Sequence, residues 1–354
     1  MESKLNENQE AKSDRQLENC NFIKTALMLL VVFGHAISLY SKNGWFNQAP
    51  ATPSLFLTYL SDWIGSFHIY AFVLVSGYIY AYLRFEKNKY DTLLPFIKNK
   101  AKRLLVPYLF ASACWVVPWQ CVFLKTSLPV LIKHYVLGIS PSQLWFLLML
   151  FGTFILAFLL SEIINRSFLH CVISALAAYG ISVVGSQILP NVFQIWKAFQ
   201  CLPLFVIGIM FRKYGISSVR RIPNIVWLTV HIALCGLCEY LDNYAGLIFK
   251  VARLGLNLCV HIVGAIMAFL ILSSIAEKLN LKDKKIYEFL KENSFTIYLF
   301  HQQIIYITIM VLNGKVPNIA FVFANFFVSL VASSLIAVVL NQWKVTRFLI
   351  GNKQ

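Results

Sequence analysis

The sequence has 354 residues, of which 58% are hydrophobic and only 13% are charged, and its mean hydropathy is +0.67. Soluble domains usually carry about 25% charged residues, so this composition excludes a soluble globular protein and indicates a polytopic membrane protein. The net charge of +16 would suit a nucleic-acid-binding protein. However, the basic residues lie between the apolar segments, as topology signals do, so we expect contact with membrane lipids and none with nucleic acid.

The first apolar segment, residues 22–40, contains two ionisable side chains, Lys24 near its start and His35 well inside it. About 19 apolar residues, at about 1.5 Å each, are enough to cross a hydrocarbon core of about 30 Å. Because about three helical turns separate Lys24 from His35, the two side chains project from nearly the same face, about 16 Å apart along the axis. Ionisable groups in a membrane helix are costly, which makes both residues functional candidates.

Further apolar segments follow, separated by polar or basic connections. The second contains the motif FHIYAFVLVSGY, and the connection after it, residues 84–103, is rich in Lys and Arg. We expect the later spans at residues 62–83, 104–124, 144–160, 168–189, 198–211, 225–241, 254–276, 294–312 and 318–340. The fold class is therefore predicted to be all-α, with about ten transmembrane helices.

The basic residues also predict the orientation of the chain. Most of the 31 Lys and Arg residues lie in the connections on the side that holds both termini. Cytoplasmic connections carry such an excess, so we expect both termini in the cytoplasm. Residues 1–19 are predicted to be a disordered tail, residues 20–343 one membrane domain and residues 344–354 a short cytoplasmic tail.

Taken residue by residue, the histidines allow two interpretations. An imidazole is largely neutral at pH 7 and can take the proton of an attacking hydroxyl, which suits His35 to acyl transfer. Alternatively, His35 packs in neutral form and hydrogen-bonds a neighbouring helix. His68 and His301 favour this packing role when each is taken alone.

The cations also have two interpretations. Lys24 either extends to the interface and helps to orient its helix, or it anchors a phosphate or carboxylate. Lys98, Lys100, Lys102 and Arg103, at the start of the third span, are either topology signals or a binding patch for a polyanion such as coenzyme A.

Small and aromatic residues complete the candidates. The Ser76 and Gly77 pair would allow close helix packing. Trp145 and Phe146 are typical of an interfacial aromatic anchor, although such rings also stack on sugars. The eight cysteines lack the spacing of a zinc site, so we expect no metal.

Five motifs in this order resemble the acyltransferase family 3 integral-membrane enzymes, which O-acylate cell-surface sugars. They are Lys24 followed eleven positions later by His35, FHIYAFVLVSGY, the basic run into LLVPY, LWFL, and NSFTIYLFH, which ends at His301. The FH…SGY and IYLFH forms are most similar to the fucose 4-O-acetylase-like branch of polysaccharide O-acetyltransferases.

The resemblance implies a multi-pass O-acetyltransferase of the bacterial cytoplasmic membrane. It would move an acetyl group from cytoplasmic acetyl-CoA to a sugar hydroxyl of a cell-surface polysaccharide or its lipid-linked precursor. Carried over by position, His35 is the catalytic base or an acyl relay, and the phosphates of acetyl-CoA contact Lys24, Lys100 and Arg103. The residues that would assist by orienting reacting groups are His68, Ser76 and His301.

The motifs depart from the family pattern at two cations. Lys24 stands where the family usually has arginine, and the family's Arg-x-x-Arg pattern occurs here as Lys100-x-x-Arg103. The charge is retained, while lysine cannot make the planar two-pronged contact of arginine.

The alternative from another class is a transporter or flippase of a lipid-linked glycan, whose usual sign is an internal repeat. Because the sequence has no convincing repeat, acyl transfer is the preferred hypothesis.

Overall fold

The structure is a computed structural model that describes residues 2–42, 44–45, 48–139, 141–279 and 284–352, with side chains from residue 16 onward. These residues are almost entirely helical, and no β-strand occurs among them. Ten helical segments in this part of the chain are long and apolar enough to cross a membrane, which confirms the all-α, ten-span prediction. They are Gln16–Tyr40, Leu55–Glu86, Leu93–Phe123, Leu128–Leu159, Phe168–Ile188, Val192–Tyr214, Asn224–Leu241, Leu247–Lys278, Lys285–Leu312 and Asn318–Leu340.

Several spans are built from more than one helix. The helices are α1 (Glu2–Ile37), α2 (Leu55–Gly65), α3 (His68–Ala81), α4 (Leu93–Ala111), α5 (Val117–Phe123), α6 (Leu128–Leu137), α7 (Trp145–Leu159), α8 (Ser161–Arg166), α9 (Phe168–Ile188), α10 (Ile195–Tyr214), α11 (Ser217–Arg220), α12 (Asn224–Leu241), α13 (Leu247–Lys278), α14 (Lys285–Leu312), α15 (Asn318–Leu340) and α16 (Lys344–Leu349). Short 3-10 or π-helical turns adjoin them at Ser38–Tyr40, Tyr82–Glu86, Ser112–Val116, Ser142–Leu144 and Val192–Gln194.

The structure is more helical than the sequence patterns predict. The prediction of a disordered tail over residues 1–19 differs from the structure, in which α1 begins at Glu2. That stretch has no Gly or Pro and is rich in Glu, Lys, Gln and Leu, which favour helix even where polarity hides the membrane signal. The expected loops 41–61 and 125–143 likewise contain the start of α2 and the whole of α6.

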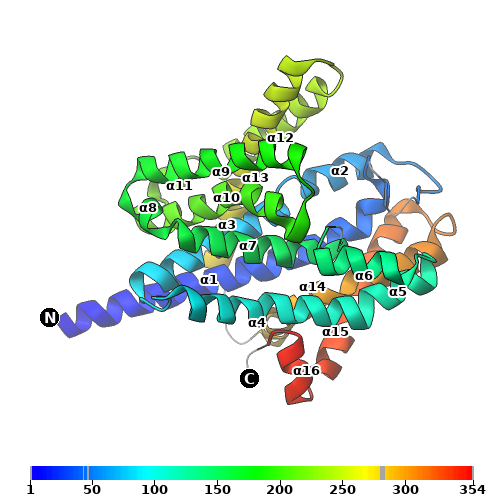
Figure 1. The fold of residues 1–354 in the computed structure, drawn as a ribbon, viewed down its shortest axis with the longest axis horizontal. Helices are drawn as coiled ribbons and strands as arrows, with labels where there is room; N and C mark the ends of the chain where they lie inside the picture. Colours follow the sequence, from blue (N-terminus) through cyan, green and yellow to red (C-terminus); the bar gives the residue numbers. More distant parts are fainter. Residues whose placement is uncertain (1, 43, 46–47, 140, 280–283, 353–354) are drawn as a thin grey trace.

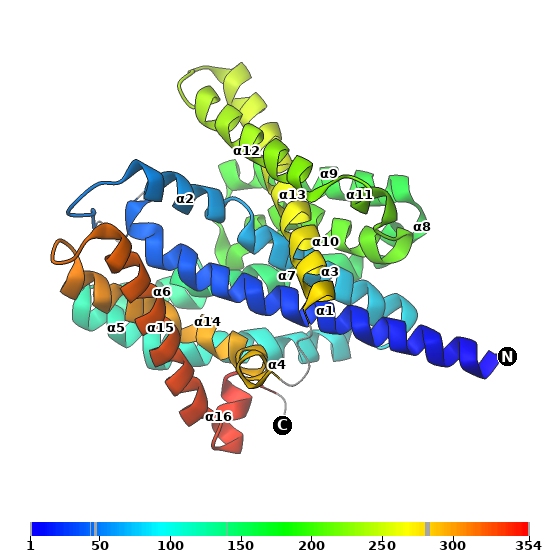
Figure 2. The same ribbon diagram turned by 180° about the vertical axis from the view of Figure 1, so that it is seen from behind.

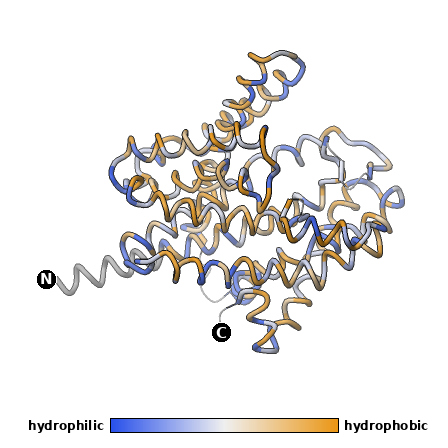
Figure 3. The backbone as a smooth tube through the Cα atoms, viewed as in Figure 1, coloured by the Kyte–Doolittle hydropathy of each residue, from blue (hydrophilic) through white to orange (hydrophobic). Residues whose placement is uncertain are grey.

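α1 runs through the middle of the bundle (Figure 1). It packs against α3, α13, α14 and α15, while α10 packs against α3, α7 and α9. Seen from behind, α4 and α14 lie on one side of α1, and α3, α10 and α13 lie on the other (Figure 2). Hydrophobic residues follow the spans, and hydrophilic residues gather at helix ends and connections (Figure 3). A side chain on α1 therefore points either toward α4 and α14 or toward α3, α10 and α13, depending on its position around the helix.

The second span is interrupted between α2 and α3, and side chains satisfy the freed carbonyl groups. His68 donates from Nδ1 to the carbonyl of Ile64 at 2.6 Å. The hydroxyl of Ser66 donates to the carbonyl of Trp63 at 2.6 Å, and His261 donates from Nδ1 to the carbonyl of Ser66 at 2.9 Å. Unsatisfied carbonyl groups are costly inside a bilayer, so these three contacts stabilise the break.

Two glycines let α3 and α10 cross at backbone contact. A Cβ atom added at Gly77 would lie 2.0 Å from the carbonyl oxygen of Phe205, and one added at Gly208 would lie 2.0 Å from that of Leu74. Any larger residue would force the helices apart, which is the usual reason for glycine at membrane helix crossings. The close packing expected at Gly77 is thus confirmed.

α12 and the first part of α13 form a hairpin that projects from the bundle (Figures 1 and 2). Its large apolar side chains are exposed, among them Ile225, Leu237 and Ile248. Exposed apolar surface of this extent on a membrane-spanning helix suits contact with lipid.

Candidate functional site

His35 and His301 meet although they come from opposite ends of the sequence. His35 lies in the last turn of α1 and His301 lies within α14, and these two helices pack together. The imidazole rings are nearly parallel, with 11° between their planes and 5.0 Å between their centroids. Nδ1 of His35 lies 2.7 Å from Nε2 of His301, so one hydrogen bond joins the rings directly.

The surroundings of His301 determine the direction of this hydrogen bond. Nδ1 of His301 lies 2.8 Å from the carbonyl oxygen of Tyr298 and 3.2 Å from that of Ile297. A carbonyl oxygen only accepts, so Nδ1 of His301 carries the proton, and Nε2 of the neutral ring is an acceptor. His35 must then donate from Nδ1. Nε2 of His35 is left with a lone pair, which is what a general base requires.

A buried amide network holds α14 around His301. Gln143, which precedes α7, donates from Nε2 to Oε1 of Gln303 at 2.9 Å. The backbone amide of Gln143 donates to Oε1 of Gln302 at 3.0 Å, and the hydroxyl of Tyr298 donates to the carbonyl of Gln143. Satisfied networks of this kind make a buried region rigid. We therefore interpret Gln143 as a residue that positions the helix carrying His301.

A cavity of about 330 Å³ leads toward the histidine pair from α1, α3, α4, α7 and α14. Val31, one turn before His35, and Tyr298, one turn before His301, are part of its lining. Charged residues lie at the other end, nine or more positions before the two histidines along α1 and α14, and in α4. They are Lys24, Lys100, Arg103, Lys291 and Glu292. The cavity thus connects a basic mouth with the turn below the histidines.

Lys100 is the most deeply buried of these cations, with only 7% of its surface exposed. Its ammonium lies 3.5 Å from the centre of the Phe154 ring, and 5.4 Å and 5.5 Å from the centres of the Phe96 and Tyr90 rings. Cation–π contacts at such distances stabilise a positive charge. They leave the N–H donors of Lys100 available to an anion that enters the cavity.

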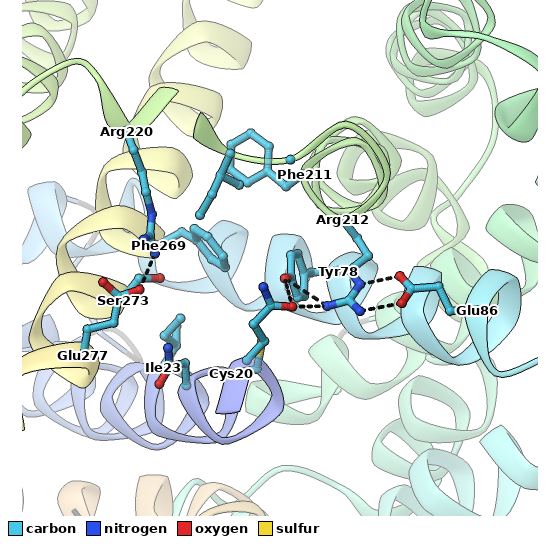
Figure 4. A pocket seen from close by; sticks show the side chains of 14 residues that line it. Cys20, Ile23, Tyr78, Glu86, Phe211, Arg212, Arg220, Phe269, Ser273 and Glu277 are labelled. Carbon is cyan, nitrogen blue, oxygen red and sulfur yellow. Dashed lines mark hydrogen bonds and ion pairs between the residues drawn. The ribbon is translucent and has the colours of Figure 1, made fainter. Parts of the chain in front are cut away.

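A larger cavity, of about 770 Å³, lies on the other face of α1 (Figure 4). The charged side chains that line this cavity are already paired with one another. Arg212 forms an ion pair with Glu86 through both Nε and Nη2, and it also donates to the hydroxyl of Tyr78. Arg220 forms an ion pair with Glu277 at 2.6 Å. An anion would have to displace a carboxylate from either guanidinium.

In the smaller cavity Lys291 pairs with Glu288 at 2.6 Å, but the other cations are not neutralised in this way. Within the described part of the chain, no carboxylate lies within ion-pair distance of Lys24, Lys100 or Arg103. Unpaired cations in a concave site favour binding of an anion. We therefore assign the candidate site to the smaller cavity, although the other one has the greater volume.

The structure brings most of the predicted site residues together. Lys24, Ser76, Lys100 and Arg103 line the smaller cavity, and the pair formed by His35 and His301 follows one turn beyond it. The hydroxyl of Ser76 donates to the carbonyl of Phe72 in the preceding turn at 2.9 Å, which leaves its oxygen as an acceptor.

Other candidates lie elsewhere. His68 is placed at the break between α2 and α3, where it satisfies a backbone carbonyl. Of the basic stretch at the start of the third span, buried Lys100 and exposed Arg103 line the cavity, whereas the exposed Lys98 and Lys102 do not. The prediction of an interfacial anchor at Phe146 is wrong, because this ring is 8% exposed and lines the cavity.

Three features of the site are not apparent from the sequence. Tyr298 lies in the same motif as His301, three positions earlier. On a helix this spacing places the two side chains on one face, and it is the one sequence signal for Tyr298. Gln143 lies in a connection without periodicity, and Phe154 lies in an apolar run where nothing distinguishes it from a packing residue. Their roles depend on contacts with residues far away in the sequence.

The fold and the site define a multi-pass helical membrane protein with an interior histidine pair at the end of a basic cavity. Residues 18–338 match the acyltransferase domain of the acyltransferase 3 family. The chain therefore belongs to this family and is a membrane-embedded acyltransferase that transfers groups other than amino-acyl groups.

Curated relatives are similar over a limited stretch. Glucans biosynthesis protein C of Escherichia coli strain SMS-3-5 is 33% identical over 138 residues, which are 36% of this chain and 34% of the relative. The proteins of the same name from strains O1:K1 and O139:H28 are 32% identical over the same shares. The match thus spans about a third of the length of these relatives. No solved structure matches the chain.

Proposed function

We propose that this protein is an O-acetyltransferase of the bacterial cytoplasmic membrane. It moves an acetyl group from acetyl-CoA to a sugar hydroxyl of a cell-surface polysaccharide or its lipid-linked precursor. The observation that carries the proposal is the hydrogen-bonded pair of His35 and His301, which leaves Nε2 of His35 as the acceptor and lies one turn beyond a cavity with unpaired cations. The name of the curated relatives, glucans biosynthesis protein C, supports a glycan as the acceptor.

The donor enters at the basic mouth in this proposal. Lys24, Lys100 and Arg103 bind the phosphates of acetyl-CoA, because charge-assisted contacts with unpaired cations are strong in a partly buried site. The pantetheine arm extends along the apolar part of the cavity, past Phe154 and Leu147, toward the histidines. With the mouth in the cytoplasm, both termini also lie in the cytoplasm, which agrees with the excess of basic residues on that side.

Proton transfer at Nε2 of His35 then drives the reaction. Nε2 takes the proton of the sugar hydroxyl while the hydroxyl oxygen attacks the thioester carbonyl. The tetrahedral intermediate collapses, the carbon–sulfur bond breaks, and the thiolate of coenzyme A receives the proton from His35. The products are the acetyl ester and free coenzyme A, and His35 returns to its starting form.

His301 acts through His35 in this scheme. The hydrogen bond to its Nε2 holds the His35 ring in one orientation and one tautomer, as the third member of a catalytic triad does. When His35 is protonated, the same bond becomes charge-assisted and stronger. His301 is therefore a positioning residue, and His35 is the catalytic base.

Mass spectrometry of surface glycans tests the proposal. Glycans would be compared from cells with the intact gene, a deletion, and His35→Ala. We expect an acetyl group to be lost from the repeat unit in both defective strains, while the variant is still inserted in the membrane. Near-normal acetylation with His35→Ala would contradict the role of this residue. Loss of glycan export with an unchanged modification pattern would instead support a transporter.

A further inference from the structure

Beyond the histidine pair, a series of aromatic rings continues away from His35. The Trp45 ring stacks on the His35 ring, with 5.9 Å between centroids and 19° between planes. Tyr306 lies 6.1 Å from Trp45, and Trp119 lies 4.5 Å from Tyr306 in an edge-to-face contact. These three rings therefore form one contiguous group that starts at the imidazole of His35. Trp45 comes from the connection after α1, Tyr306 from α14 and Trp119 from α5.

This group lies on the side of the histidine pair away from the cations. Tyr306 follows His301 by more than one turn along α14, whereas the cavity lining lies before His301. Trp119 is near the far end of the third span, about 24 Å along the helical path from Arg103 at 1.5 Å per residue. The cavity and the aromatic group therefore approach His35 from opposite directions.

Trp119 also has an unsatisfied donor. Its indole N–H is buried and has no hydrogen-bond partner among the described residues, although the residue is only 7% exposed. By contrast, Trp115 donates to the carbonyl of Phe300 and Trp196 donates to that of Leu189. A buried donor without a partner costs about 1–3 kcal/mol and calls for an explanation in each case. An oxygen of a bound ligand would satisfy it.

We infer that Trp45, Tyr306 and Trp119 form the subsite for the acceptor, and that this acceptor is a pyranose. The inference rests on the proposed transfer to a sugar. A pyranose has apolar C–H faces that pack on aromatic rings, and rigid Trp and Tyr side chains provide such surface at low entropic cost. The indole N–H of Trp119 donates to an oxygen of the sugar. A hydroxyl of the same sugar is then presented to Nε2 of His35 from the side opposite the donor.

A binding measurement that does not depend on catalysis tests this inference. The full-length His35→Ala protein in lipid nanodiscs would be titrated with pyranose oligosaccharides, prepared by hydrolysing the surface polysaccharide of the deletion strain. Adding Trp119→Phe keeps a ring and removes the N–H, so we expect the dissociation constant to rise about 10-fold. Trp45→Leu removes the ring in the connection after α1 and keeps an apolar side chain, and it should weaken binding by a similar factor.

Trp196→Phe is the matched control, because it removes an indole N–H that is bonded to the carbonyl of Leu189, between α9 and α10. Its dissociation constant should equal that of the parent. Equal binding with Trp119→Phe and Trp45→Leu, or no binding to the parent at all, would overturn the subsite. The proposed function fails separately, if wild-type protein that binds the oligosaccharide transfers no acetyl group to it from acetyl-CoA.

Discussion

Nδ1 of His35 and Nε2 of His301 lie 2.7 Å apart, and this single contact joins the first and ninth spans at the site. The contact is directional, because Nδ1–H of His301 already donates a hydrogen bond to the carbonyl of Tyr298. One ring therefore keeps a free lone pair while the other holds it in place. The two histidines should respond differently to substitution.

Replacement of His301 should impair activity less than loss of His35. His35→Ala removes the base, and general base catalysis typically contributes about 100- to 10,000-fold in rate. His301→Ala leaves the base but frees its ring, so we expect kcat to fall about 100-fold or less. The measurement is coenzyme A release by purified protein with acetyl-CoA and acceptor glycan.

His301→Gln separates positioning from simple packing. The amide oxygen of Gln can accept the hydrogen bond from Nδ1 of His35, so this variant should recover part of the kcat that His301→Ala loses. A merely structural role predicts no such recovery. Equal kcat values for the Ala and Gln variants, at equal thermal stability, would count against the hydrogen bond as the working contact.

His35 should not become acetylated during the reaction. In the proposed mechanism Nε2 of His35 carries a proton only, and the acetyl group passes directly to the sugar. Rapid quenching after addition of isotopically labelled acetyl-CoA, without acceptor, followed by peptide mass spectrometry, should find no label on the α1 peptide. A label on His35 that disappears when acceptor is added would instead establish an acyl relay.

Lys100 should contribute to donor binding at the expense of stability. Lys100→Met keeps the length of the side chain and removes the charge, so we expect the KM for acetyl-CoA to rise about 10- to 100-fold. Without donor, the melting temperature should stay the same or rise, because an ammonium without a carboxylate partner no longer has to be buried. Radiolabelled acetyl-CoA binding and thermal unfolding would provide the two values.

Lys102→Met is the control for Lys100→Met. It removes the same charge from an exposed position two residues further along α4, so the net charge near the mouth falls by one unit in both variants. Its KM should remain within about two-fold of the wild type, because exposed charges are screened. A similar rise in both variants would mean that general electrostatic attraction, rather than a specific contact, binds the donor.

Much of the fold follows from hydropathy alone. An apolar run of about 20 residues predicts a membrane span whatever the rest of the chain contains, so the sequence predicts all ten spans. The predicted range 318–340 coincides with α15. Helix that lies outside these runs is not predicted, because its residues are polar. The beginning of α1 and the basic first half of α4 are examples.

The site was predictable only where one helix carries the pattern. The spacing of Lys100 and Arg103 places both on one face of α4, and the structure turns that face to the cavity. The bond between His35 and His301 depends on how α1 and α14 pack, so residue spacing could suggest each histidine but not their contact. The ring of Phe154 over Lys100 is similarly a property of the packed bundle.

Substitution of Gly77 should separate α3 from α10 and disturb the cavity. In Gly77→Ala the new Cβ atom meets the backbone of Phe205 at 2.0 Å, and backbone cannot yield as a flexible side chain does. Such overpacking typically costs about 1–3 kcal/mol, so the melting temperature should fall. Because Ser76 of α3 lines the cavity, the KM for acetyl-CoA should rise as well.

Gly180→Ala in α9 is the control for Gly77→Ala, since a Cβ atom there meets nothing within 4 Å. The same added methyl group should leave stability unchanged or slightly higher. Equal melting temperatures for the two variants would contradict the backbone contact between α3 and α10.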